Sequence, residues 1–549
     1  MVRLLYLLAV AGLAGSSLGQ EKWCNKNYKK GSPVVPPGGQ FPVPSVTAST
    51  LLAFRCTPIY KPYIAEDVAF SAGFIVDAVV THAQVRGTKP IALVPAIEVL
   101  FVKISVGSNV LAIGEVPVNA TKFEIPISLS QLLPRKDPYT VTCSATYHGN
   151  QEYTTNASLS YLPNPPSGSV TKLDSRTGGL WTKRFDGGNL AGYTPVFPLG
   201  FYTSFGDYLA KNLSILNDLK ARGINMVHPI PTFDNLTALD LVLDQMEELG
   251  LYLMYDMRWS YKNLSAVEEE VSRIKTRGNL LLWYTADEPD GWGDPLDATS
   301  LAYDRIYDID GYHPVSLVLN CQDYEFEAYA AGTDIVMQDV YTIGLNATYS
   351  VVWDTECTPD YGDCGCDNCV GEFEDIPRRI GQFGDRLGAL GWERTKAIWT
   401  VPQAFGGSSY WSRIPTGNEW VVQSLLAVAH GALGIVPWTD PTSDDIEAAA
   451  TTLSQQLLPS LARFTSDHDV TFATYVWQRV HFGTWSVGKK TLVVGVNLDS
   501  QERKTPLSQL PEWKDRAELD VLYIVDATFE SGYLILEGLG AAGFVITRQ

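Results

Sequence analysis

Between residues 197 and 438 the sequence alternates short apolar runs with amphipathic stretches, and this alternation limits the possible folds more than any other feature. Near-continuous apolar runs are typical of parallel strands buried on both faces of a sheet. Two of the amphipathic stretches end in Gly directly before the next run, which is a helix stop signal. The eight runs are 197–202, 224–230, 251–257, 280–286, 315–320, 334–341, 397–405 and 434–438. They predict an α/β chain folded as a closed (β/α)8 TIM barrel.

A doubly wound open sheet is the alternative fold for the same pattern. That fold would place a Gly-rich phosphate-binding turn after a strand, and no such turn follows any of the eight runs. We therefore prefer the barrel.

Both flanks of the barrel have strand-like patterning. Residues 45–162 alternate apolar and polar side chains with period two, so an N-terminal β-sandwich domain is expected over residues 20–165. Residues 166–180 continue a Pro-, Gly- and Ser-rich stretch and are expected to form a linker into the barrel at 181–465. Strand-like runs return afterwards and predict a C-terminal β-domain over 466–549.

The first 19 residues have the pattern of a secretory signal peptide, with a basic residue, an apolar run and small residues before Gln20. No later stretch reaches the ~20 apolar residues of a membrane-spanning helix. A net charge of −20 argues against a nucleic-acid partner. We therefore expect a secreted, extracellular protein with no membrane association. Six N-x-S/T sequons are candidate glycosylation sites: Asn119, Asn156, Asn212, Asn235, Asn263 and Asn346.

Eight cysteines in an oxidising compartment are expected to be mostly paired. Four of them lie in an insert at 342–375, between the sixth and seventh strands, with no His nearby: Cys357, Cys364, Cys366 and Cys369. We expect two local disulfides there rather than a metal cluster, in a loop on the catalytic face. The remaining four are Cys24, Cys56, Cys143 and Cys321. Either one bridge among them crosses domains or two thiols stay free.

Active sites of TIM barrels lie at the carboxyl ends of the strands. The predicted strand ends carry carboxylates, aromatic rings and amides rather than a nucleophilic Ser elbow, a zinc motif or a phosphate loop. Such a mixture suits sugars, because aromatic faces stack on sugar C–H surfaces while amides and Arg bind hydroxyls. Neither a metal nor a cofactor is expected, and the expected partner is an oligo- or polysaccharide. The candidate substrate-binding residues are Tyr202, His228, Asp256, Arg258, Trp259, Asp287, Asn320, Tyr341, Gln403 and Trp438.

Two motifs carry a resemblance to a known group of enzymes. They are WYTADEP at 283–289 and the D-x-Y formed by Asp339, Val340 and Tyr341 at the end of the sixth strand. With them, the chain resembles secreted fungal (β/α)8 glycoside hydrolases of the clan that carries its acid/base Glu after the fourth strand. The resemblance covers the barrel and implies that Glu288 is the general acid or acid/base.

The chain departs from that clan at the seventh strand. The clan places a nucleophilic Glu there, whereas this sequence has Gln403. Asp339 is our candidate for the second catalytic carboxylate, kept ionised by a hydrogen bond from Tyr341, and Asp256 is the runner-up. Gln403 would then bind substrate.

The sequence thus predicts an extracellular glycoside hydrolase that cleaves a plant or microbial cell-wall glycan by two-carboxylate acid/base chemistry. A catalytically inactive carbohydrate-binding barrel is one alternative, for which the missing seventh-strand Glu is the evidence. A transglycosylase or lyase on the same fold is another.

Overall fold

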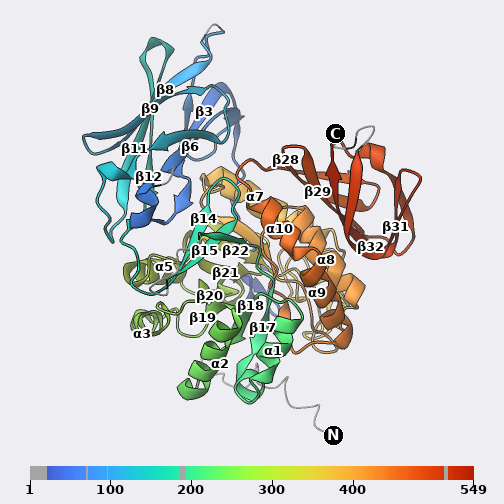
Figure 1. Cartoon of the computed structure of the whole chain (residues 1–549). Coiled ribbons are helices and arrows are strands. Elements are labelled where there is room, and N and C mark those ends of the chain that lie inside the picture. The colour runs from blue at the N-terminus through green and yellow to red at the C-terminus, as the bar shows by residue number, and fades with distance from the viewer. Residues whose placement is uncertain are drawn as a thin grey trace.

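This computed structural model describes residues 21–69, 72–95, 97–185, 192–511, 513 and 517–548. The signal peptide expected at 1–19 lies outside these residues. Figure 1 shows a central barrel with one β-domain on each side of it. In the described part of the chain, no helix is both long enough and apolar enough to cross a membrane.

The barrel is a closed sheet of eight parallel strands. The first seven strands pair in sequence order, and the eighth pairs with the first. Short bridges from Thr400 to Ile435 and from Gln403 to Trp438 complete the closure between the seventh and eighth strands. The strands are β17 (Gly200–Ser204), β18 (Met226–Ile230), β19 (Tyr252–Asp256), β20 (Leu280–Asp287), β21 (Val315–Leu319), β22 (Ile335–Gln338), β25 (Ala397–Thr400) and β26 (Trp438–Asp440). The predicted TIM barrel is confirmed, since all eight strands fall within or beside the expected runs.

Helices cover the outside of the barrel, and their ends follow from local sequence. The side chains of Asn235 and Asn263 cap two helix N-termini, and Thr416 forms a capping box with Glu419 on a third. Gly250 ends a helix in the left-handed conformation that Gly tolerates best. The helices are α1 (Ser214–Ala221), α2 (Leu236–Leu249), α3 (Leu264–Ile274), α4 (Pro289–Trp292), α5 (Ala298–Ile309), α6 (Phe326–Ala331), α7 (Asp375–Leu390), α8 (Gly417–Ala429), α9 (Asp444–Gln456) and α10 (Leu458–Thr465).

The stretch expected to be a linker is instead part of the folded core. Within 166–180 the chain forms β14 (Gly168–Asp174), in which all seven residues are buried. It joins a four-stranded antiparallel sheet with β4 (Tyr60–Lys61), β15 (Leu180–Phe185) and β16 (Thr194–Val196). Leu173 and Leu180 pack with residues of the barrel interior such as Met254. The linker prediction was wrong because the turn residues at its two ends bound a strand that covers the amino-terminal end of the barrel.

The N-terminal domain is a sandwich of two four-stranded antiparallel sheets (Figure 1). One sheet has β10 (Phe123–Ile127), β6 (Ala72–Ala83), β3 (Val46–Pro58) and β7 (Thr88–Pro90) in that order. The other has β12 (Gln151–Leu159), β11 (Tyr139–Tyr147), β8 (Val99–Val106) and β9 (Asn109–Pro117). A disulfide between Cys56 on β3 and Cys143 on β11 joins the two sheets.

Residues 21–41 do not belong to this sandwich, although the domain was expected to begin at residue 20. They form a short ribbon of β1 (Lys22–Trp23) and β2 (Lys26–Asn27) that lies against the barrel. The Cys24–Cys321 disulfide fixes them there, and Gln40 forms a β-bridge with Tyr324. One bridge therefore crosses domains, which was one of the two open possibilities.

The C-terminal domain is one six-stranded antiparallel sheet, against which α8 of the barrel packs. Its strands are β27 (Thr471–Trp477), β28 (Val480–Val487), β29 (Lys490–Asn497), β30 (Arg503–Pro506), β31 (Glu518–Glu530) and β32 (Tyr533–Thr547). All six sequon asparagines, on the sandwich and on the barrel, are exposed, as glycan attachment would require.

Candidate active site

Glu288 directly follows β20 at the carboxyl end of the barrel. Its backbone lies in the left-handed region, with φ 51° and ψ 47°, at the start of α4. A non-Gly residue pays for that conformation, and strained positions of this kind cluster at functional sites. The backbone N–H of Glu288 donates to the carbonyl of Val318 at 3.2 Å, which fixes the turn to the neighbouring strand.

The carboxyl groups of Glu288 and Asp339 lie within hydrogen-bonding reach of each other, and Asn320 binds both. The Nδ2 of Asn320 donates to Oε1 of Glu288 at 2.9 Å and to Oδ1 of Asp339 at 3.3 Å. Burial, and next the charge of Asp339, raise the pKa of Glu288 well above its ordinary value. Burial also raises the pKa of Asp339, although hydrogen bonds from Glu288 and Asn320 oppose that rise. Both carboxyl groups of this dyad therefore have raised pKa values, that of Glu288 more strongly than that of Asp339.

The hydrogen bond that the sequence assigned to Tyr341 is made by Asn320 instead. Tyr341 is buried at the same strand end, where its ring packs edge-on against Phe405 and Trp411. Trp411 donates its Nε1 proton to the carbonyl of Tyr341 at 3.1 Å. Tyr341 thus forms part of the aromatic wall beside the dyad.

A third carboxylate of the rim, Asp287, is held by a buried ion network. Its Oδ2 accepts from Nη1 of Arg258 at 2.8 Å, and its Oδ1 accepts from the hydroxyl of Tyr284. Asp256 binds the other side of the same guanidinium, with Nε and Nη2 of Arg258 at 2.8 and 2.7 Å from its Oδ2. Nε2 of His228 lies 2.8 Å from that same oxygen. The side chain of Asp287 remains 25% exposed, so this carboxylate is paired yet open to solvent.

Aromatic rings surround Arg258 and form a second wall. Its guanidinium carbon lies 5.3 Å from the ring centroid of Tyr202 and 5.2 Å from that of Trp438. The hydroxyl of Tyr202 donates a hydrogen bond to the hydroxyl oxygen of Tyr284 at 3.1 Å. Trp259 follows Arg258 and is 65% exposed, so its ring is available to a ligand.

Three of the predicted substrate-binding residues have buried side chains that a substrate in the barrel mouth could not contact. Gln403 is fully buried, and its amide binds the backbone N–H and C=O of Ile343 at 2.9 and 3.0 Å. His228 is fully buried beneath Tyr202, with ring centroids 4.1 Å apart, and burial lowers its pKa. The side chain of Asp256 is wholly covered, which also removes it as runner-up for the second catalytic carboxylate. Polar side chains at strand ends can equally hold the loops together, and these three do so.

Sequence reasoning missed three residues that organise the site. Trp23 donates its Nε1 proton to Oδ1 of Asn320 at 3.0 Å. Asp290 is buried, accepts backbone N–H bonds from Asn320 and Cys321, and has a pKa raised by burial to about 7. Arg379 of α7 donates to the carbonyl of Asn320 at 2.5 Å. No pattern in the sequence singles out Trp23 or Arg379; Asp290, inside DEPD, could have been noticed.

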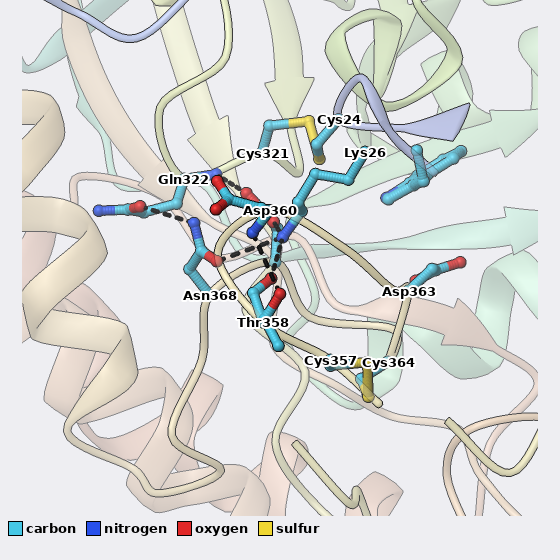
Figure 2. Close-up of polar contacts among 12 residues, drawn as sticks. Cys24, Lys26, Cys321, Gln322, Cys357, Thr358, Asp360, Asp363, Cys364 and Asn368 are labelled. Carbon is cyan, nitrogen blue, oxygen red and sulfur yellow. Dashed lines mark hydrogen bonds and ion pairs between the residues drawn. A yellow bond between two sulfur atoms is a disulfide. The ribbon is translucent and has the colours of Figure 1, made fainter. Parts of the chain in front are cut away.

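The insert contains the two predicted local disulfides, Cys357–Cys364 and Cys366–Cys369. It lies between β22 and β25 at the catalytic end, where Asn368 donates to the side chain of Gln322 at 3.0 Å (Figure 2). A cavity of about 360 Å³ separates parts of the insert from the ribbon of residues 22–27. The cluster of Cys24, Cys321 and Asp367 has the proximity of a metal site, but both of its sulfur atoms belong to a disulfide.

The geometry allows Glu288 to donate a proton and Asp339 to hold that proton in place. Carboxyl groups that act from opposite sides of a glycosidic bond lie about 5–9.5 Å apart, which is more than groups in direct contact can span. In chemistry of that kind the second group would have to be another carboxylate of the rim, and Asp287 is paired but open to solvent.

No protein-family model matches the chain, and no curated protein matches it. Among solved structures, it is similar to an alpha-amylase from Geobacillus thermoleovorans complexed with acarbose, at 10% identity and a TM-score of 0.39 over 62% of this chain and 92% of that one. It is also similar to a GH30 endoxylanase from Clostridium papyrosolvens, at 9% identity and a TM-score of 0.38 over 64% and 97% of the two chains. A third similar structure is an FMN-binding beta-glucuronidase from Facaelibacterium prausnitzii, at 11% identity and a TM-score of 0.34. The matched region spans 90% of this chain and 70% of that one. At these identities and TM-scores the likeness supplies no argument for the activity of this chain.

Proposed function

We propose that this protein is a glycoside hydrolase in which Glu288 is the general acid. The observation that carries the proposal is the Glu288–Asp339 dyad, because it gives a carboxyl group at a barrel mouth a pKa well above its ordinary value. A carboxyl group whose pKa is raised keeps its proton to higher pH and can protonate the leaving glycosidic oxygen. Asp339 holds the proton on Glu288 and, through Asn320, stays part of the same hydrogen-bond network.

Asp287 is the candidate for the nucleophile or base of the same reaction. Its ion pair with Arg258 holds the carboxylate in place, and its 25% exposed side chain leaves it open to a substrate or a water molecule. Asp339 was the sequence-based choice for this role, and the direct contact with Glu288 supports the acid-assisting role better.

The substrate that fits the site is a neutral oligo- or polysaccharide. Carboxyl groups outnumber guanidinium groups around the dyad, since Asp287, Asp290 and Asp339 lie near Glu288. Of the two guanidinium groups nearby, Arg258 is paired twice and Arg379 is bound to backbone carbonyls. This excess of negative charge disfavours uronic acids. The exposed Trp259 supplies a stacking surface for a sugar ring.

We further propose that the protein is secreted and acts on a plant or microbial cell-wall glycan. Four disulfides support an oxidising compartment. The signal-peptide pattern of residues 1–19 and the six exposed sequons support the same route.

The test is Glu288→Gln assayed on cell-wall polysaccharides and on aryl glycosides. Loss of a general acid typically costs ~10²-fold or more, so turnover of unactivated polysaccharide should fall by at least about that factor. A dinitrophenyl glycoside needs little protonation of its leaving group and should lose far less. Glu325→Gln is the matched control, because Glu325 has the same left-handed backbone, φ 48°, at the start of α6.

Three outcomes would contradict the proposal. Turnover by Glu288→Gln within a few-fold of wild type on every substrate would remove the acid role. Tight glycan binding without any product from the wild type would identify an inactive binding protein. Transfer products or unsaturated sugars in the product analysis would identify a transglycosylase or a lyase.

A further inference from the structure

The ribbon formed by residues 22–27 approaches the catalytic end of the barrel from outside it. Its first strand, β1, packs against α4, the short helix that begins directly after Glu288. The ring of Trp23 lies so close to that helix that a Cβ on Gly291 would sit 2.3 Å from it. Trp23 also meets the ring of Trp292, the next residue of that helix, edge-on, with centroids 5.3 Å apart. The indole is therefore held in one position beside the dyad.

We propose that Trp23 is a positioning residue of the active site, which sets the orientation of Asn320 and is fixed there by the Cys24–Cys321 disulfide. The inference rests on the proposed function, because it assigns Trp23 a part in the reaction of Glu288 and Asp339.

The chemistry of the two side chains defines what Trp23 does. An indole N–H can only donate a hydrogen bond, whereas the amide of Asn320 has a donor end and an acceptor end. Because Nε1 of Trp23 faces the Oδ1 of Asn320 at 3.0 Å, the Nδ2 group must point the other way. That group then donates to both Glu288 and Asp339. A reversed amide would set its oxygen against two carboxyl groups and its NH2 group against the indole N–H.

The disulfide is placed where it can maintain this contact. Cys24 follows Trp23 in the chain and Cys321 follows Asn320, so one S–S bond ties together the two residues next to the hydrogen-bonded pair. Both cysteines are buried, and the bridge joins positions 297 residues apart. Closing so long a loop restricts the freedom of the ribbon to leave the barrel.

A second anchor holds the same ribbon to the insert. Lys26, 6% exposed at its side chain, pairs with Asp367 and donates to Oδ1 of Asn368 at 3.2 Å (Figure 2). Tyr361 of the insert donates to the carbonyl of Lys29 at 2.6 Å. The Cys-rich insert therefore supports Trp23 at a distance, and the sequence segment that carries Trp23 is clamped on both sides.

The primary test is Trp23→Phe, which keeps an aromatic ring but removes the indole N–H together with one of the two fused rings. Losing the hydrogen bond that orients a charged pair should lower kcat by about 5- to 20-fold, with KM within about two-fold of wild type. Because the Asn320 bond lowers the pKa of Asp339, weakening it should let the dyad keep its proton to higher pH. The alkaline limb of the pH–rate profile, where the general acid loses its proton, should therefore move to higher pH. Trp353→Phe is the matched control: it makes the same ring change and removes the bond from the indole of Trp353, in the insert, to the hydroxyl of Tyr410. It should leave kcat and the profile unchanged.

A double-mutant cycle separates positioning from general packing. Trp23→Phe should add nothing to Asn320→Ala, because both changes remove the same oriented donor. The pair Cys24→Ala and Cys321→Ala should reproduce the Trp23→Phe profile in protein that still folds. Additive losses, or a Trp23→Phe enzyme with wild-type kcat and pH profile, would overturn the proposal.

A readout without turnover distinguishes this proposal from the proposed function. With 13C-labelled Glu and Asp carboxyl groups, the Glu288 and Asp339 resonances can be titrated by NMR in wild type and Trp23→Phe. A shifted titration supports the positioning role even if no glycan proves to be a substrate. Identical titrations would refute it even if Glu288 proves to be the acid.

Discussion

Replacing Arg258 by Met tests the buried ion network that positions Asp287. The guanidinium is buried and makes three close N···O contacts with Asp256 and Asp287, between 2.7 and 2.8 Å. Burial raises the pKa of Asp256, but the charge of Arg258 and the hydrogen bond from His228 outweigh that effect and hold it below its ordinary value. Without Arg258, a wholly covered carboxylate would keep only its bonds to His228 and to one backbone N–H.

Breaking a buried pair by removing one partner costs about 3–5 kcal/mol, because the other charge stays buried without compensation. Met fills much of the same space between Tyr202 and Trp438, so lost packing contributes little. Asp287 adds less than Asp256, since water reaches the exposed quarter of its side chain. We therefore expect Arg258→Met to destabilise the barrel by about 3–5 kcal/mol.

The assay is urea unfolding at pH 7 followed by tryptophan fluorescence. Adding Asp256→Asn to Arg258→Met should recover about 2 kcal/mol or more, because neutralising the orphaned carboxylate removes the penalty. Arg277→Met is the surface control, since Arg277 pairs with the 63% exposed Asp244, and it should cost less than about 1 kcal/mol. The reasoning is refuted if Arg258→Met stays within about 1 kcal/mol of wild type, or if the double variant is no more stable than the single.

Two further predictions concern stability. Burial, and next the charge of Glu447, raise the pKa of Asp440 to about 7 from 3.8. A raised carboxyl pKa stabilises the fold at low pH, and that contribution disappears as the pH rises through 7, so Asp440→Asn should gain on the order of 2 kcal/mol relative to wild type between pH 5 and pH 8. Thermal unfolding at both pH values measures this, and an unchanged difference would contradict it. Gly200→Ala should destabilise by at least about 2 kcal/mol, because its Cβ would lie 2.1 Å from the backbone oxygen of Met226. Gly381→Ala, with open space in α7, should stabilise the fold by about 0.5–1 kcal/mol. If thermal unfolding shows the two Gly→Ala variants shifting the melting temperature in the same direction, local space does not decide the outcome.

The barrel could be predicted because its signal is local and repeated. Apolar runs of strand length alternate with amphipathic helices that carry their own caps, so each unit specifies itself. The strand β14 could not be recognised in the same way. The strand has only seven residues and is flanked by turn residues. Its residues are buried because they pack against the amino-terminal end of the barrel.

The sequence allowed part of the candidate site to be predicted. Glu288 and Asp339 follow apolar strands, and strand ends gather at one rim in this fold. Alternation along β20 then decided which neighbours they have: Tyr284 faces the barrel interior, while Trp283 faces the helices and donates to Asp310 at 2.7 Å. Gln403 lies at an equivalent strand end, but its amide binds the backbone N–H and C=O of Ile343. It therefore fixes that loop and is not free to bind a ligand.

The sequence by itself determined the number and type of the barrel units and the rim on which acidic residues gather, because periodicity and caps act over a few residues. Only the tertiary structure decided that two of these carboxyl groups touch and that Arg258 pairs with two others. The same holds for Trp23, which reaches Asn320 from 297 residues away. Contacts of this kind depend on which strands become neighbours and on which segment covers the barrel mouth. Both are set by the packing of the whole chain, and a single sequence carries no local pattern for either.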